Sequence, residues 1–182
     1  MNILVTGGAR SGKSGFAEKL MQSLTDQAVY VATGQAFDEE MKERIALHQQ
    51  QRVESGYAWE TLEEPYDLPA LLQRLSGDTV VLVDCLTLWL SNALLAAEGF
   101  ENRKELVENE IARLEDSVRS FEGTLIMVTN EVGDGIVPEY ALGRLYRDLA
   151  GRMNALLAKQ CEQVFLVTAG IPIELKSREY HL

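Results

Sequence analysis

The chain has 182 residues, of which 46% are hydrophobic and 25% are charged, a composition typical of a soluble globular protein and sufficient for one domain with a full core over 1–182. Its formal net charge of −11 disfavours nucleic acid as a partner, and no apolar run approaches the roughly 20 residues that span a membrane. The two cysteines, Cys85 and Cys161, form no C-x-x-C pair. We therefore expect a cytoplasmic protein with buried thiols and without a disulfide or a cysteine metal site.

The first predicted element is a buried strand over 2–6. Because it carries Asn2 and runs straight into a glycine loop, we do not expect a signal peptide. The loop matches the phosphate-loop pattern G-x-x-x-x-G-K-[ST] without a mismatch, through Gly7, Gly8, Ala9, Arg10, Ser11, Gly12, Lys13 and Ser14.

Apolar residues at helical spacing over 14–24 predict a helix that begins at the end of this loop. The N-terminus of such a helix presents free backbone N–H groups and a positive dipole end to an anion. Lys13 can reach the β- and γ-phosphates, and the Ser14 hydroxyl can ligate Mg²⁺. Strand, loop and helix together predict a site for a nucleoside triphosphate.

The rest of the chain alternates strand-like and helix-like segments. Short runs rich in Val, Ile and Leu and apolar on both faces predict strands over 3–5, 28–32, 79–83, 124–128 and 163–168. Amphipathic segments predict helices near 14–24, 38–52, 67–75, 86–97, 102–121 and 139–160. This order predicts the α/β class, a P-loop NTPase-type three-layer α/β/α fold with a mainly parallel, RecA-like sheet and ligands at the carboxyl ends of its strands.

Two later strand ends indicate what happens to the nucleotide. The apolar strand over 79–83 ends in Asp84, and a carboxylate in this place in phosphate-loop enzymes typically holds Mg²⁺ or its waters. The alternative is that Asp84 caps the helix that begins near Leu86. The polar loop over 129–135 lacks the N-K-x-D signature with which switch GTPases read guanine, which disfavours a regulatory GTPase.

One of the two histidines, His48, lies within the helix predicted over 38–52, whereas His181 lies in a polar tail over 177–182. Asp38 is a plausible N-cap of that helix, and Met41, Ile45 and His48 share one of its faces.

Arg44 and Arg52 flank His48 at four residues on either side, close enough to interact with it. Two guanidinium groups disfavour the protonated ring and favour the neutral imidazole, which can act as a nucleophile, and they attract a polyphosphate. The spacing alone slightly favours the alternative, a helix histidine that is half-covered by packing beside two solvated arginines.

An ordered set of motifs resembles one family, the bifunctional adenosylcobinamide kinase / adenosylcobinamide-phosphate guanylyltransferase of cobalamin biosynthesis. The motifs are G-G-A-R-S-G-K-S at 7–14, R-x-x-x-H at 44–48 with Arg52 following, W-x-T-x-E at 59–63, T-N-E-V-G at 129–133 and D-L-A-G-R-M-N at 148–154. The resemblance extends from Ile3 to about Ile173, and the tail over 177–182 has no assigned role.

The resemblance implies that His48 is the histidine that accepts GMP from GTP. Many relatives carry a pair of histidines here, whereas this chain has Leu47 before His48. It further implies that the nucleotide is contacted by Thr33, Gly34, Gln35, Gln49, Gln50, Gln51, Arg52, Glu63 and Asp84.

The implied reaction has two steps that use Mg²⁺ with GTP or ATP. The aminopropanol hydroxyl of adenosylcobinamide is first phosphorylated, and GMP then passes from GTP through a guanylyl-histidine to give adenosylcobinamide-GDP. The resemblance also implies a homo-oligomer, with a trimer expected. Two alternatives stay open at this point: a simple small-molecule kinase in which His48 is structural, and a non-enzymatic nucleotide-dependent regulator.

Overall fold

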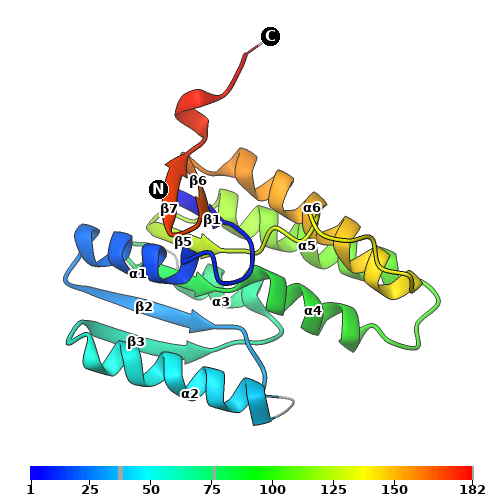
Figure 1. Cartoon of the computed structure of the whole chain (residues 1–182), viewed down its shortest axis with the longest axis horizontal. Coiled ribbons are helices and arrows are strands. Elements are labelled where there is room, and N and C mark those ends of the chain that lie inside the picture. Colours follow the sequence, from blue (N-terminus) through cyan, green and yellow to red (C-terminus); the bar gives the residue numbers. More distant parts are fainter. Residues whose placement is uncertain (37–38, 76, 182) are drawn as a thin grey trace.

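The computed structural model describes residues 1–36, 39–75 and 77–181 (Figure 1). The strands are β1 (Asn2–Thr6), β2 (Gln27–Ala32), β3 (Ala58–Glu63), β4 (Val80–Asp84), β5 (Thr124–Val128), β6 (Gln163–Thr168) and β7 (Ile171–Glu174). The helices are α1 (Lys13–Leu24), α2 (Glu39–Glu54), α3 (Leu68–Leu75), α4 (Leu86–Ala96), α5 (Arg103–Arg119) and α6 (Ala141–Gln160), and a 3₁₀ turn, η1 (Lys176–Arg178), follows β7.

Within the described residues, seven strands form one sheet in the order β3-β2-β4-β5-β1-β6-β7. The first six strands run parallel, and β7 pairs antiparallel with β6. The register aligns Asp84 with Ala32 on one side and with Val128 on the other. The carboxyl ends of β2, β4, β5 and β1 therefore meet at one edge of the sheet, where the phosphate loop leaves β1.

Helices cover both faces of the sheet, so the predicted three layers are confirmed. Alternation along β1 sends Leu4 into the core beneath α3, α4, α5 and α6, whereas Ile3 and Val5 pack toward α1. The second helix, α2, lies beside β3 at the edge of the sheet (Figure 1), and its Arg52 covers Tyr30 on the α1 face. Among the described helices, none combines the length and apolar character that a membrane span requires.

Two strands, β3 and β7, were not among the predicted elements. Both are edge strands, and most of their residues are exposed or only half-buried. β3 therefore carries polar residues between its apolar ones, and β7 contains Pro172, which an edge strand tolerates because its outer N–H groups need no partner.

Both cysteines are buried free thiols, as expected. Asp38, the predicted cap of α2, lies outside the described residues.

Candidate nucleotide-binding site

The phosphate loop closes tightly between β1 and α1. The Ser11 N–H donates to the Gly8 carbonyl at 3.3 Å, and α1 begins at Lys13 after Gly12, whose φ of 94° is in the left-handed region. At Gly7 a Cβ atom would lie 2.4 Å from the Val167 carbonyl oxygen, so only glycine fits there. Glycine is therefore required at these two positions for different reasons. At Gly7 the Val167 carbonyl approaches too closely for a side chain, and at Gly12 the backbone is left-handed.

Lys13 is held within this loop. The residue is only 8% exposed, and its Nζ donates to the Gly8 carbonyl oxygen at 3.1 Å. Its ammonium group and the first free N–H groups of α1 therefore lie on the same small surface, which is an arrangement suited to an anion.

A cavity of about 460 Å³ adjoins the loop, and it brings together side chains from both sides of the strand edge. Nine of the predicted site residues line it: Lys13, Ser14, Gly34, Gln35, His48, Gln49, Arg52, Glu63 and Asp84. Its volume and its mixture of apolar and polar walls are those of a site for a small organic ligand.

Of the other predicted site residues whose side chains the structure describes, none is among those that line this cavity. Gly7 to Gly12 form the adjoining loop. The Thr33 side chain is fully buried and faces the backbone of Cys85, because its hydroxyl donates to the Cys85 carbonyl at 2.6 Å and accepts from the Cys85 N–H at 2.9 Å. Gln50 is exposed and donates to Glu54 Oε1 at 2.7 Å. The side chain of Gln51 lies outside what the structure describes.

One face of α2 points into the cavity. Ile45 and His48 both line it, so the shared face predicted for these two residues is confirmed, and Arg52 lines it as well. The side chains of Met41 and Arg44 lie outside the described part of the chain. Arg52 is 6% exposed, and its guanidinium carbon lies 3.7 Å from the centre of the Tyr30 ring. This cation–π contact attaches the C-terminal end of α2 to the sheet.

Asp84 lies at the end of β4, with its Oδ2 3.2 Å from the hydroxyl of Tyr30, which donates to it. The N-cap of α4 is Cys85, and the helix has no side-chain capping hydrogen bond. The alternative that Asp84 caps α4 is therefore wrong, and its carboxylate faces the cavity instead.

Negative charge is concentrated around Asp84. Burial, followed by the charge of Asp84, raises the pKa of the Glu18 carboxyl in α1, and the Arg52 guanidinium opposes this rise. Burial and the same carboxylate raise the pKa of Tyr30 well above its ordinary value, so its hydroxyl remains a proton donor at neutral pH. A cation bound beside Asp84 would relieve this repulsion.

Sequence reasoning did not identify Tyr30 or Asn130, which both line the cavity, as site residues. Asn130 follows β5, lines the cavity and donates to Thr87 Oγ1 at 2.9 Å. The buried Asn154 of α6 in turn donates to the Asn130 carbonyl at 3.2 Å. The T-N-E-V-G motif at 129–133 marked this loop in the sequence but did not show that its asparagine reaches the cavity.

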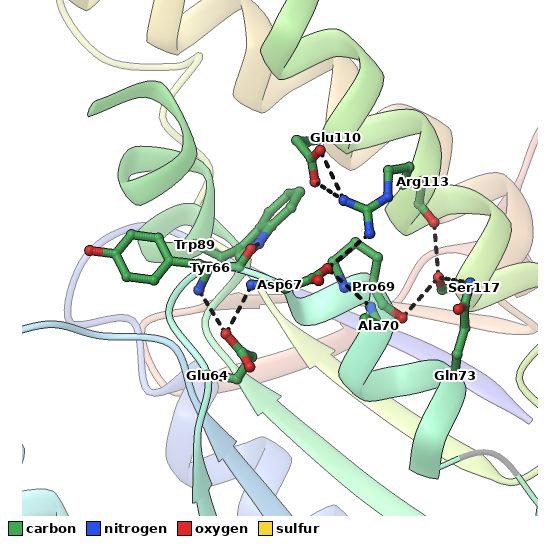
Figure 2. A network of polar contacts seen from close by, with 10 residues as sticks. All are labelled: Glu64, Tyr66, Asp67, Pro69, Ala70, Gln73, Trp89, Glu110, Arg113 and Ser117. Atoms are coloured by element: carbon green, nitrogen blue, oxygen red, sulfur yellow. Dashed lines mark hydrogen bonds and ion pairs between the residues drawn. The ribbon is translucent and has the colours of Figure 1, made fainter. Parts of the chain in front are cut away.

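The loop after Glu63 is fixed by a separate network (Figure 2). The Trp89 indole N–H donates to the Tyr66 carbonyl at 2.8 Å, and the backbone N–H groups of Tyr66 and Asp67 donate to Glu64 Oε1 at 3.0 and 2.9 Å. These bonds hold the start of α3 against α4 and so fix the position of the cavity wall formed by Glu63 and Pro65.

The mainly parallel sheet, the glycine loop that follows its inner strand β1 and the helix that begins after this loop define a P-loop nucleotide-binding protein. Over residues 3–175 the chain matches the family model described as cobinamide kinase / cobinamide phosphate guanyltransferase. The chain belongs to this family.

Full-length relatives agree with the family model. The chain is 41% identical to the bifunctional adenosylcobalamin biosynthesis protein CobP of Pseudomonas aeruginosa over 177 residues, which cover 97% of this chain and 98% of that protein. It is 40% identical to the bifunctional adenosylcobalamin biosynthesis protein CobU of Escherichia coli over 185 residues, or 97% and 100% of the two chains. CobU of Salmonella typhimurium is also 40% identical, with the same coverage.

Solved structures support the fold alone. An ATPase of the type III secretion system of pathogenic bacteria superposes with a TM-score of 0.53 at 14% identity, covering all of this chain and 58% of that one. A Pyrococcus horikoshii protein superposes with a TM-score of 0.50 at 11% identity, covering 95% and 84%. The RecA-like P-loop architecture predicted from the sequence is confirmed.

Proposed function

We propose that this protein phosphorylates the aminopropanol hydroxyl of adenosylcobinamide and then converts the product to adenosylcobinamide-GDP through a guanylyl-histidine at His48. The observation that carries the proposal is that His48 and the phosphate-loop lysine, Lys13, line the same cavity. A kinase needs only the loop, whereas transfer of a nucleotidyl group through the enzyme also needs a nucleophile beside it. Family membership and the names of the relatives support both activities.

In the kinase step the acceptor hydroxyl attacks the γ-phosphorus while the bond to the β-phosphate oxygen breaks. Lys13 and the N–H groups at the start of α1 offset the charge on the transferred group and hold it in line. The residues present also fit Mg²⁺, because the Ser14 hydroxyl and the Asp84 carboxylate are oxygen ligands on one cavity wall. When bound there, Mg²⁺ would neutralise charge on the β- and γ-phosphates.

In the transfer step a ring nitrogen of neutral His48 attacks the α-phosphorus of GTP, and the bond to pyrophosphate breaks. The resulting P–N bond is broken in turn when a phosphate oxygen of the corrinoid attacks, and the histidine leaves as neutral imidazole. Covalent catalysis of this kind divides one difficult displacement into two easier ones. Arg52, one helical turn after His48 and on the same cavity, supplies positive charge toward the phosphates.

Covalent labelling tests the proposal. Protein incubated with Mg²⁺ and GTP labelled on the α-phosphorus is expected to keep its label through denaturation, whereas label on the γ-phosphorus is lost with pyrophosphate. The adduct is expected to be lost in acid and to persist in alkali, because a phosphoramidate is acid-labile. His48→Ala should remove the label and keep part of the kinase activity, and the matched variant His181→Ala should retain the label.

The outcomes separate the rival functions. If the wild type forms no adduct but still phosphorylates the corrinoid, the protein is a simple kinase and His48 is structural. Undiminished labelling of His48→Ala would assign the nucleophile to another residue. Corrinoid-dependent turnover of either kind excludes a purely regulatory nucleotide-binding protein.

We also propose that the protein is cytoplasmic and folds as one domain, as its cysteine usage and its length of 182 residues indicate, and that it forms a homotrimer, as the sequence resemblance implies. Sedimentation equilibrium tests the last point, since a trimer of this 20.3 kDa chain is readily separated from a monomer by mass.

A further inference from the structure

One side chain, Tyr30 in β2, contacts both the carboxylate at the end of β4 and the helix that carries His48. The residue is 4% exposed and lies on the sheet face that α1 covers. Its hydroxyl donates to Asp84 Oδ2 at 3.2 Å, while its ring centre lies 3.7 Å from the guanidinium carbon of Arg52. The ring and the hydroxyl thus make separate contacts with two elements that are far apart in the sequence.

The ring is itself held in place from the neighbouring strand. Trp59 of β3 meets Tyr30 edge to face, with ring centres 5.7 Å apart and planes at 86°. Trp59 also packs against Tyr57, at 4.7 Å between ring centres. Because the Tyr30 ring is buried and packs against both Trp59 and Arg52, it forms a well-packed platform for the Arg52 guanidinium.

Each contact has a consequence for one reaction step. The hydroxyl restricts rotation of the Asp84 carboxylate and so sets the direction in which it meets a cation or its waters, as partners of metal ligands generally do. The ring seats Arg52, which lies one turn after His48 on the cavity face of α2. The position of that ring therefore helps to determine where His48 lies relative to the phosphate loop.

We propose that Tyr30 is a positioning residue shared by the two steps: its hydroxyl orients Asp84 for the kinase reaction, and its ring seats Arg52, and with it the His48 helix, for guanylyl transfer. This inference rests on the function proposed above.

Two substitutions separate the two contacts. Tyr30→Phe keeps the ring and removes the hydroxyl, and it should raise the half-saturating Mg²⁺ concentration of the kinase step about tenfold. At saturating Mg²⁺, its rate of His48 labelling from α-labelled GTP should stay within about twofold of the wild type. Tyr30→Leu removes both contacts and should in addition slow that labelling about tenfold, because even a small displacement of His48 from its reacting position lowers the rate.

A matched control removes the hydroxyl of a different, half-buried tyrosine. Tyr146 of α6 donates to the Thr87 carbonyl at 3.0 Å and is not among the residues that line the cavity in the described chain. Tyr146→Phe should change neither the Mg²⁺ dependence nor the labelling rate.

Two readouts do not require turnover. Electron paramagnetic resonance titration of the GDP-bound protein with Mn²⁺ should show about tenfold weaker binding for Tyr30→Phe. Hydrogen exchange of the α2 amides should be faster in Tyr30→Leu than in the wild type and unchanged in Tyr30→Phe. If Tyr30→Leu does not fold, Arg52→Gln removes the ring contact from its other side and should give the same faster exchange in α2.

The inference is overturned if Tyr30→Phe leaves both the Mn²⁺ affinity and the Mg²⁺ dependence at wild-type values, or if Tyr30→Phe and Tyr30→Leu impair the two steps equally. If the proposed function itself is wrong, the wild type will neither phosphorylate a corrinoid nor form an acid-labile adduct. In that case Mn²⁺ binding and hydrogen exchange still decide whether Tyr30 holds Asp84 and α2.

Discussion

The side-chain amide of Asn92 in α4 donates a 2.8 Å hydrogen bond to the backbone carbonyl of Thr33, in the loop that follows β2. The same amide nitrogen donates to the Pro65 carbonyl at 3.0 Å, in the loop that follows β3. Asn92 is 4% exposed, and Gly34 and Pro65 of these two loops line the cavity. One buried amide thus fixes the separation of two cavity walls.

Replacing Asn92 by leucine should therefore affect both stability and nucleotide binding. The buried carbonyl of Thr33 and the partly buried carbonyl of Pro65 lose their donor, which should lower the free energy of unfolding by roughly 1–3 kcal/mol. The loosened loops should also raise the KM for the nucleotide more than they lower kcat. Urea unfolding and steady-state kinetics measure the two effects.

The control for this variant is Asn102→Ala, since Asn102 is exposed and makes no side-chain capping bond to α5. If the Asn92→Leu protein is destabilised but keeps the wild-type KM for the nucleotide, the hydrogen bonds of Asn92 to the two loops stabilise the fold and do not affect nucleotide binding.

Lys13→Ala is expected to suppress phosphorylation and guanylyl transfer together, each by about 10²-fold or more, because one preorganised cationic donor is lost from both transition states. Both half-reactions and a circular dichroism melt should be measured. Since Lys13 is largely buried against Gly8, Lys13→Met is the better test of folding, because it keeps the length of the side chain. Retention of either activity near the wild-type level would indicate two separate phosphate sites.

Asp84→Asn should raise the Mg²⁺ concentration needed for turnover by more than Tyr30→Phe does, because the variant removes the charge itself and not only its orientation. The cap of α4 should be unaffected, since Cys85 occupies that position. A Mg²⁺ titration of the kinase step measures the effect. A Mg²⁺ dependence equal to that of the wild type would exclude Asp84 from the metal site.

Local sequence patterns predicted the parts of the fold that are buried on both faces. The strands β1, β2, β4, β5 and β6 are short apolar runs, and each was predicted within two residues of its bounds. The two edge strands were missed because a strand that is half open to solvent has no continuous apolar run, and the polar residues of β3 resemble those of a loop.

The site residues divide in the same way into those that local sequence patterns predict and those that depend on contacts between distant segments. Lys13, Ser14, Asp84 and His48 were predicted because each belongs to a motif or follows a strand. Tyr30 was not, because within an apolar strand it has the pattern of a core residue. Its role depends on the pairing of β2 with β4, which places Ala32 opposite Asp84. The sequence of neither strand alone predicts which strand it pairs with.

Both thiols should be unreactive in the folded protein. Burial, followed by the charge of Asp84, raises the pKa of Cys85 to about 11, and burial raises the pKa of Cys161 to about 12. With this pKa, only about one in a thousand Cys85 side chains would be in the reactive thiolate form at pH 8. An aromatic disulfide reagent should therefore modify neither cysteine without urea and both in urea. Rapid modification at pH 8 without denaturant would show that one of these sites opens.

The carboxylate of Glu174 should make the end of the chain sensitive to acid. The Ser177 hydroxyl and the backbone N–H groups of Ser177, Val164 and Lys176 donate to it and lower its pKa to about 2, from an ordinary value of 4.5. Because the folded pKa is depressed, the ionised group stabilises the folded state fully above about pH 4.5, and this contribution is lost as the pH falls to about 2. Glu174→Gln should thus be less stable than the wild type at pH 7, with a difference in the free energy of unfolding that narrows as the pH falls through this window. Urea midpoints measured from pH 2 to pH 7 test this, and a difference that does not depend on pH would mean that Glu174 acts through its shape and not through its charge.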